Sequence, residues 1–242
     1  MGIRTNVINE YLMFDGKSSL DYGVIISGSG VYNSPARDIE SIAIPGRNGE
    51  LHIDNGRFEN IKVTYPAFIV KDFEHNFNAF KAMLKSTIGY KRLEDSYQPK
   101  YYRLGLFSDE LNPSMAVRNV AGSFNISFDC DPRLFLKSGE EVIEYTSSGQ
   151  QIKNPTEFNS KPLIRAYGTG SVTVGGITIT VNTADVYTDL NCELMEAYKG
   201  STNCNGNITV NSYKFPELLP GLNTITFNGL SKVEITPNWW TI

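Results

Sequence analysis

Short runs in which apolar and polar residues alternate make up most of this chain. Ile61, Val63 and Tyr65 occupy alternate positions with polar residues between them, which is the pattern of a strand with one buried face. Apolar runs of strand length also occur in the first half at 10–14, 20–26, 101–107 and 116–128. The pattern therefore predicts a mainly β protein.

One segment of the first half has helical periodicity instead. Its apolar positions fall on one helix face while polar residues occupy the other. The residues that share the apolar face are Phe73, Phe77, Phe80 and Leu84. Asp72 is placed to cap the start of this helix, and Gly89 is placed to end it.

Two clusters of turn residues lie between the isoleucine-rich segment 39–44 and the strand that starts at Ile61. The first contains Asn48-Gly49, which readily adopts the positive φ of a tight turn, and the second is Asp54-Asn55-Gly56. We therefore predict a protruding hairpin over residues 45–57 with a turn at each cluster.

The character of the chain changes after residues 132–139, and from there short strands and turns follow one another without a convincing helix. Strand patterns occur at 162–167, 172–174, 177–181, 208–210, 224–227 and 232–236. Gly175-Gly176 joins two of them as the two-residue turn of a hairpin. We therefore expect two domains, 1–137 and 138–242, the second being a sandwich or a jelly roll.

Composition narrows the class of protein. The chain has 242 residues, of which 40% are hydrophobic and 12% aromatic, enough for folded cores and too many for disorder. A net charge of −4 argues against a dedicated nucleic-acid binder. No apolar run approaches the roughly 20 residues that span a bilayer, and residues 1–6 lack the order of a signal peptide. We expect a protein made in the cytoplasm, without membrane insertion.

The residues that usually carry chemistry form no known motif here. Cys130, Cys192 and Cys204 are odd in number and lack zinc-site spacing, so we expect ordinary thiols and no metal or cofactor. His52 and His75 have no nucleophile at motif spacing.

Acidic and aromatic pairs give only weak alternatives. Asp129 and Asp131 share a strand face and raise the alternative of a glycosidase or calcium site, but a strand ending at Pro132 explains them better. The aromatic pair Trp239-Trp240 has two interpretations: a glycan contact, or an anchor that closes the last strand. We therefore expect no enzyme.

Four groups of turn residues resemble, in order along the chain, those of the distal tail protein (Dit) family of siphophages. The groups in the first half are Ile44-Pro45-Gly46-Arg47-Asn48-Gly49-Glu50-Leu51 with Asp54-Asn55-Gly56, and the junction 132–139. The second half contributes Asn154-Pro155, Ser160, Pro162-Leu163-Ile164, Gly168 and Gly170, and then Phe215-Pro216, Leu218, Pro220-Gly221, Asn223 and Ile225.

This resemblance implies a phage-tail hub. The N-terminal domain is expected to be a tail-tube-like β-sandwich or barrel with a helix, closing with five copies into a hexameric ring around a DNA-wide channel. The C-terminal domain is expected to be a galectin-like antiparallel sandwich. The implied neighbours are the tail tube protein on one side and a tail-associated lysin, fibre or receptor-binding protein on the other, at the virion tail tip. Some relatives carry a sugar-binding insertion or long arm in the second domain, for which this chain has no room.

The predicted hairpin is the candidate contact with a neighbour, through Arg47, Asn48, Glu50, Asp54 and Arg57. Opposite charges on it would fix the register of a protein contact. Two alternatives remain open: a solvated surface hairpin, or arginines that face DNA in the channel, which the two acidic residues disfavour. The alternative function for the whole chain is carbohydrate binding by the C-terminal sandwich, with Trp239 and Trp240 as its glycan contact.

Overall fold

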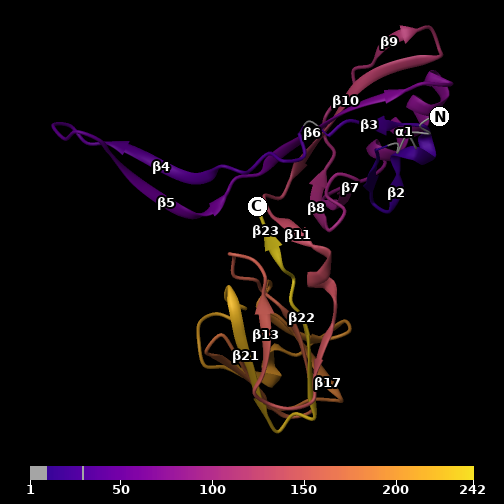
Figure 1. The fold of residues 1–242 in the computed structure, drawn as a ribbon. Coiled ribbons are helices and arrows are strands. Elements are labelled where there is room, and N and C mark those ends of the chain that lie inside the picture. The colour runs from indigo at the N-terminus through magenta and orange to yellow at the C-terminus, as the bar shows by residue number, and fades with distance from the viewer. Residues whose placement is uncertain (1–9, 29) are drawn as a thin grey trace, which may run out of the picture. The chain divides into compact units, whose positions relative to one another are not determined.

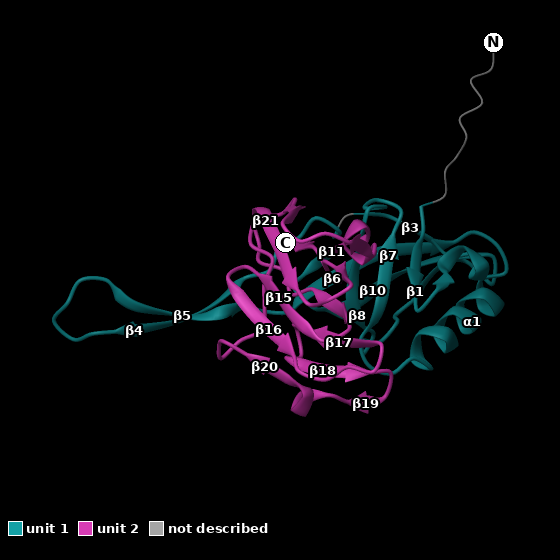
Figure 2. Ribbon diagram, turned by 90° about the horizontal axis from the view of Figure 1, so that it is seen from below, with its two compact units in different colours: residues 1–134, 242 teal, residues 135–241 magenta. Residues whose placement is uncertain are grey.

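Antiparallel strands dominate the computed structural model of the chain, which describes residues 10–28 and 30–242 (Figure 1). Residues 1–6, from which we expect no signal peptide, lie outside the described residues. The chain divides into two compact units, residues 1–134 with 242 and residues 135–241 (Figure 2). The prediction of a mainly β fold with one α-helix is confirmed for the described residues.

Unit 1 is built on a sheet with the strand order β2-β1-β7-β8-β10-β6-β3. These strands are β1 (Leu12–Phe14), β2 (Lys17–Ser18), β3 (Ile25–Ile26), β6 (Ile61–Ile69), β7 (Lys91–Asp95), β8 (Tyr101–Leu106) and β10 (Ala121–Cys130). Outside this path, β9 (Ser114–Val117) pairs with β10, while β4 (Arg37–Ala43) and β5 (Glu50–Phe58) pair with each other.

Helix α1 (Phe73–Lys85) packs its apolar face on the sheet of unit 1. Phe77 meets Phe124 of β10 edge-on, with ring centroids 5.0 Å apart, and Phe80 is fully buried. The alternating strand β6 supplies Val63 and Tyr65 to the same core. The helical periodicity and the strand alternation therefore predicted these two elements correctly.

The ends of α1 differ from the prediction. Asp72 occupies the N-cap position, but it has a left-handed backbone and its side chain makes no capping bond; Asn119 Oδ1 accepts from the Glu74 N–H at 3.0 Å instead. The helix ends at Lys85, before Gly89. A residue distant in the sequence, Asn119, thus caps the helix N-terminus, where the sequence predicted a cap by the adjacent Asp72.

Two predicted strands are also divided in the structure. Residues 20–26 form the end of a short 3₁₀ helix, Ser19–Tyr22, and then β3, because Gly23 takes a positive φ of 65° and turns the chain. Residues 116–128 belong to β9 and β10, which are joined by a turn at Asn119 with φ 54°.

Unit 2 is a sandwich of two antiparallel sheets. Their strand orders are β12-β22-β14-β17-β18-β19 and β13-β21-β15-β16-β20. The first sheet comprises β12 (Ile143–Tyr145), β14 (Leu163–Tyr167), β17 (Tyr187–Asn191), β18 (Glu196–Lys199), β19 (Thr202–Asn203) and β22 (Lys232–Thr236). The second comprises β13 (Gln150–Asn154), β15 (Gly170–Val174), β16 (Ile177–Val181), β20 (Ile208–Val210) and β21 (Gly221–Asn228). Three further elements complete the chain: β11 (Leu134–Leu136), the 3₁₀ turn Lys137–Glu140, and β23 (Trp240–Thr241).

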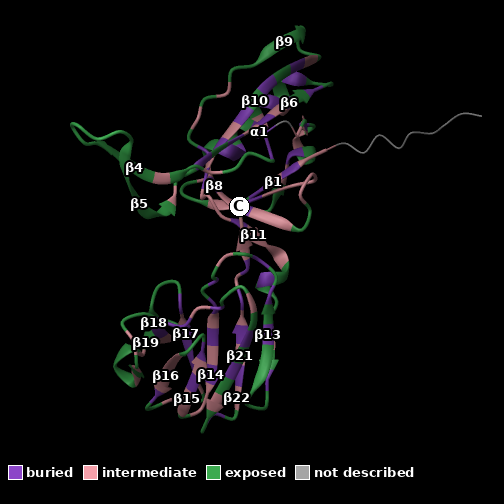
Figure 3. Cartoon of the chain, turned by 60° about the vertical axis from the view of Figure 1, so that its left-hand side comes forward, coloured by how far each residue is buried: buried purple, intermediate pink, exposed green. Residues whose placement is uncertain are grey.

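The predicted hairpin of unit 2 is confirmed. Val172 pairs with Ile179 and Val174 with Ile177 across Gly175-Gly176, whose φ values of 57° and 78° suit a two-residue turn. Val172, Val174 and Ile179 are fully buried between the sheets, where buried positions line the interior of the sandwich (Figure 3).

Buried polar side chains at the turns account for the motifs of the second half. Asn154 Nδ2 donates to the carbonyls of Phe158 and Leu218 at 2.9 and 3.1 Å. Asn223 likewise closes its own loop, accepting from Leu219 N at 2.8 Å and donating to Leu219 O at 2.7 Å. Each side-chain amide supplies hydrogen-bond partners to backbone groups of its turn. These two positions therefore favour Asn.

We expect Val174→Asp to lower the free energy of unfolding by about 3–5 kcal/mol, because it leaves an unpaired carboxylate between the two sheets. Thr173→Asp places the same charge on the neighbouring, partly exposed position of β15 and is the matched control. Chemical denaturation checks both variants, and equal midpoints for Val174→Asp and the parent would contradict this strand register.

Candidate protein-interaction site

Strands β4 and β5 form a two-stranded hairpin that reaches away from the rest of unit 1 (Figure 1). Among the described residues these strands pair only with each other, and nearly every residue in them is exposed (Figure 3). An isolated two-stranded hairpin is marginally stable in water, so contact with a partner surface would stabilise this element.

Charged side chains hold the base of the hairpin together. Arg37 Nη1 donates to Asp54 Oδ2 at 3.0 Å, and its guanidinium lies 4.8 Å from the centre of the Phe58 ring. On the other side, Asp38 accepts from Asn55 Nδ2 at 3.0 Å and from Arg57 Nε at 2.6 Å. These hydrogen bonds, that of Asn55 first, hold the pKa of Asp38 below its ordinary value.

The predicted second turn at Asp54-Asn55-Gly56 is wrong. These residues lie within β5, and the hairpin spans 37–58 instead of 45–57. Arg37 pairs with Phe58 but Ile39 pairs with Asp54, so three residues of β5 oppose one residue of β4 in a bulge. Gly56 supplies the φ of 72° that the bulge needs, and its N–H donates to Asp54 Oδ1 at 2.8 Å.

The five predicted interface residues therefore fall into two groups. Asp54 and Arg57 lie at the base and form ion pairs within the chain. Arg47, Asn48 and Glu50 lie at the far end, where neither Arg47 nor Glu50 has an ion pair among the described residues. Only this second group keeps its charges available for another molecule.

The pairing register gives the hairpin two chemically different faces. Ile42 pairs with Leu51 and Glu40 pairs with Ile53, so Ile42, Leu51 and Ile53 share one face, with Glu40 at its edge. They are 38%, 43% and 42% exposed, respectively. The other face carries Ile39 together with Ser41 and His52, whose Oγ and Nδ1 lie 2.8 Å apart in a hydrogen bond.

We call Ile42, Leu51 and Ile53 the apolar hairpin face. The prediction from charge missed it, although alternating apolar residues on both sides of the turn could have revealed it. Three exposed aliphatic side chains side by side on a free ribbon are typical of a surface that another protein covers.

A hollow of about 330 Å³ lies elsewhere on unit 1, between α1 and β9. Phe73, Phe77 and Met115 form its apolar lining, and Arg118 and Glu74 place opposite charges at it. Met115 is 59% exposed. The hairpin and α1 lie at opposite ends of unit 1 (Figure 2).

The candidate catalytic carboxylates have structural partners. Asp131 forms a two-point ion pair with Arg133, with Oδ1 3.0 Å from Nε and Oδ2 2.9 Å from Nη2. Asp129 accepts from Asn60 Nδ2 at 3.2 Å. His75 is exposed on α1, and His52 is bound to Ser41. The structure does not bring these residues together.

Two of the three cysteines are buried in the cores of the two units. Burial raises the pKa of Cys130 and of Cys192 to about 12, so both are protonated at neutral pH. Among the described residues, no group of His, Cys, Asp and Glu has the arrangement of a metal site. Within the same residues, no helix is long and apolar enough to cross a membrane.

Of the two candidate glycan contacts, Trp239 is buried in the core of unit 2 at 4% exposure and cannot stack on a sugar. A Cβ on Gly139 would lie 2.3 Å from Trp239 N, so the glycine of the junction motif makes room for this segment. Trp240 is partly exposed, but it stacks on Phe158 and donates from Nε1 to Asn159 O at 2.9 Å. The anchor interpretation fits both residues better.

Solved structures of phage-tail proteins share this fold. The Dit protein of phage SPP1, described as a paradigm of the hub adsorption apparatus in phages that infect Gram-positive bacteria, matches with a TM-score of 0.73 and 13% identity, over 96% of this chain and 99% of that one.

A chain of the phage P2 baseplate in its activated conformation also matches. With calcium it has a TM-score of 0.50 and 12% identity over 95% of this chain and 97% of that one. With strontium it has a TM-score of 0.52 and 13% identity over 94% and 96%. No protein-family model and no curated protein matches the sequence.

The chain therefore has a Dit-like fold over nearly its whole length, as the four groups of turn residues predicted. At this level of identity the likeness establishes the fold.

We expect the pKa of Asp38 to lie below its ordinary value of 3.8. Stabilisation of the hairpin base is then present above pH 3.8 and is lost as the pH falls through the lowered pKa. An NMR titration of the carboxyl carbon checks this, with Asn55→Ala and Arg57→Gln each moving the value upward. Arg47→Gln, at the far end, is the control and should leave it unchanged; a native pKa at or above 3.8 would contradict the base geometry.

Proposed function

We propose that this protein is the structural hub of a phage or prophage tail tip, where it forms a ring between the tail tube and the proteins below. The observation that carries the proposal is the fold shared with the SPP1 hub protein over 96% of this chain and 99% of that one. In this proposal residues 1–137 form the ring, residues 138–242 form the outer sandwich, and DNA passes through the channel. The proposed role of the protein is structural, without catalysis.

The proposed partners follow from the same role. They are five further copies of this chain, the tail tube protein, and a tail-associated lysin, fibre or receptor-binding protein. Assembly takes place in the bacterial cytoplasm, and the mature location is the virion tail tip. The P2 match, which comes from a baseplate structure, supports a position among other tail proteins.

Unit 1 has surfaces suited to a ring of identical copies. A protrusion at one end and an apolar hollow at the other end are different surfaces, so contact between them joins copies head to tail. Repeated head-to-tail contact closes into a ring when the rotation between copies allows it. We assign the apolar hairpin face of one copy to the hollow between α1 and β9 of the next.

The chemistry of the two surfaces is complementary. Ile42, Leu51 and Ile53 would cover Met115, which is exposed in the single chain and lies beside the buried Phe77, so the contact buries apolar side chains of both copies. Arg47 and Glu50, free of ion pairs within the described residues, supply charges for the rim of the contact. Because Arg57 is already bound to Asp38, it contributes little to a phosphate contact, which weakens the DNA alternative.

We expect Ile42→Asp to weaken ring assembly at least about tenfold, because it places a charge in the centre of an apolar contact. Ser41→Asp is the matched control: it adds the same charge to the adjacent residue on the opposite hairpin face and should leave assembly nearly unchanged. Sedimentation velocity over a concentration series, with and without the tail tube protein, measures the species. Equal assembly by both variants would overturn the hairpin assignment, and a monomeric parent under both conditions would overturn the ring.

A second variant tests the acceptor surface. Met115→Asp should also prevent ring closure, since the hollow is then charged. If contact runs head to tail, mixing Ile42→Asp chains with Met115→Asp chains leaves one intact hairpin and one intact hollow, so the mixture forms pairs but no rings. Recovery of full rings, or the absence of pairs, would contradict the assignment of this hollow.

A further inference from the structure

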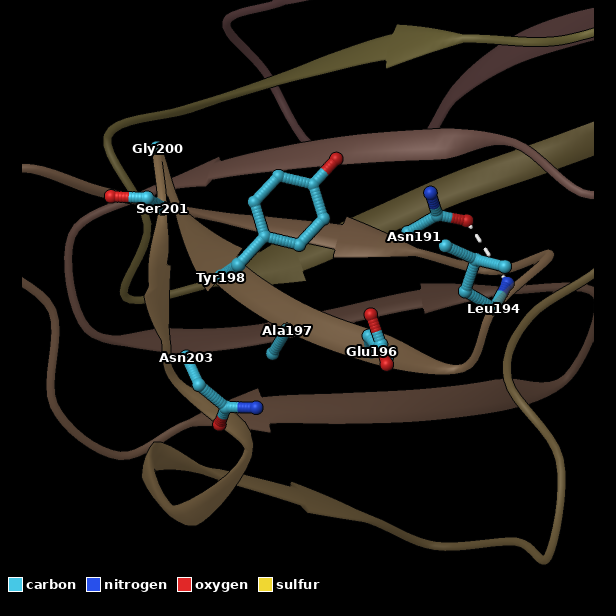
Figure 4. Close-up of a pocket in the computed structure, with 8 residues that line it drawn as sticks. All are labelled: Asn191, Leu194, Glu196, Ala197, Tyr198, Gly200, Ser201 and Asn203. Carbon is cyan, nitrogen blue, oxygen red and sulfur yellow. Dashed lines mark hydrogen bonds between the residues drawn. The ribbon is translucent and has the colours of Figure 1, made fainter. Parts of the chain in front are cut away.

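A shallow depression of about 360 Å³ lies on unit 2, at the end of the first sheet where β17, β18 and β19 meet (Figure 4). Its volume falls at the lower end of the range for small-molecule sites, roughly 300–1,000 Å³. The lining residues come from these three strands and the turns between them: Asn191, Leu194, Glu196, Ala197, Tyr198, Gly200, Ser201 and Asn203.

Strand register brings the polar side chains of the depression to one face. Asn191 pairs with Glu196, and Tyr198 pairs with Asn203, so these four residues point outward from the same part of the sheet. Ala197, between Glu196 and Tyr198, is fully buried and faces the core. Figure 4 shows the tyrosine ring rising from β18 beside these groups.

The amide groups of the depression are oriented by hydrogen bonds of their oxygens. Asn191 Oδ1 accepts from the backbone N–H groups of Glu193 and Leu194 at 3.0 and 3.1 Å. Asn203 Oδ1 accepts from Asn205 N at 2.9 Å. Because both amide oxygens already accept hydrogen bonds, the NH₂ groups of Asn191 and Asn203 are the groups left to donate. Among the described residues neither NH₂ group has a hydrogen-bond partner.

Two groups of charged side chains on the same sheet are paired within the chain. Arg165 binds Asp189 through two hydrogen bonds of 2.6 and 2.9 Å. Lys232 binds both Glu144 and Glu234 at 2.7 Å. The carboxylate of Glu196 and the hydroxyls of Tyr198 and Ser201, by contrast, have no such partner within the described part of the chain. The depression therefore presents a carboxylate and two hydroxyls that are available to a ligand.

We infer that this depression binds a neutral saccharide unit. Two NH₂ donors, one carboxylate acceptor and two hydroxyls offer both kinds of hydrogen bond that sugar hydroxyls make. The partly exposed Tyr198 ring offers an apolar face for the C–H face of a sugar ring. No cation lines the depression, and Glu196 repels anions, so phosphate is excluded as the ligand.

Neither Trp239 nor Trp240 lines this depression. Saccharide binding here does not depend on the proposed hub role, because every residue involved belongs to unit 2. A tail-tip protein with such a site would make weak contacts to surface glycans, multiplied by the number of copies in the assembly.

Saturation-transfer difference NMR on the full-length protein tests the inference, with galactose, glucose and N-acetylglucosamine as probes and with choline and inorganic phosphate as charged comparisons. We expect transfer to at least one sugar and a Kd of about 1 mM. Tyr198→Ala should weaken binding at least about tenfold, whereas Tyr198→Phe keeps the ring and should stay within a few-fold of the parent.

Asn203→Asp retains the oxygen that accepts from Asn205 N while replacing the NH₂ donor, so it should lower sugar affinity several-fold without loosening the turn. Tyr213→Ala, at a tyrosine that is 93% exposed and outside the depression, is the matched control and should bind like the parent. Thermal melts confirm that each variant is folded.

Three results would overturn the inference. They are no transfer to any of the sugars, transfer that persists unchanged in Tyr198→Ala and Asn203→Asp, or preferential binding of choline, which would make the depression an ammonium site. Sedimentation of the same variants keeps the hub proposal separate, since none of these residues lies on the hairpin or the hollow of unit 1.

Discussion

The side-chain amide of Asn154 fastens together the two loops on which the sandwich of unit 2 depends. Through its bonds to Phe158 O and Leu218 O it ties the turn after β13 to the segment before β21, and Ser160 completes the join by exchanging backbone bonds with Leu218 at 3.0 and 2.9 Å. Buried backbone groups in a turn need such partners, because water cannot reach them. The same constraint limits which residues can occupy these turns, because few other side chains reproduce the hydrogen-bonding geometry of Asn154.

A different constraint governs the surface of unit 1. The β4–β5 hairpin has too few neighbours to bury its apolar face, and Asp38 and Asp54 form ion pairs across its base. An uncovered apolar face beside a base with internal ion pairs suits docking onto another chain, because docking buries the apolar side chains without breaking those pairs. The charges predicted to mediate this contact act mainly within the hairpin, and the aliphatic residues take the larger proposed role.

Several elements could be predicted from local pattern alone. The α1 face, the alternation in β6 and the Gly175-Gly176 turn depend on residues close in sequence, so periodicity and turn chemistry were sufficient for them. The errors arose where a distant partner intervened. Asn119 replaced Asp72 as the cap of α1, and pairing with β4 drew Asp54-Asn55-Gly56 into a strand as a bulge. Trp239 entered the core because Gly139 leaves space for its backbone.

By itself, the sequence determined the β-rich class, the positions of most turns and the Dit-like fold, because turn residues are constrained by their own backbone conformation. Only the tertiary structure decided which side chains are available to other molecules. It showed that Arg57 and Asp54 form ion pairs within the hairpin and that Ile42, Leu51 and Ile53 share one face. It also placed beside Tyr198 polar side chains that have no partner among the described residues. Whether a side chain is available to another molecule depends on strand register and on partners far apart in the chain. A local sequence pattern contains neither kind of information.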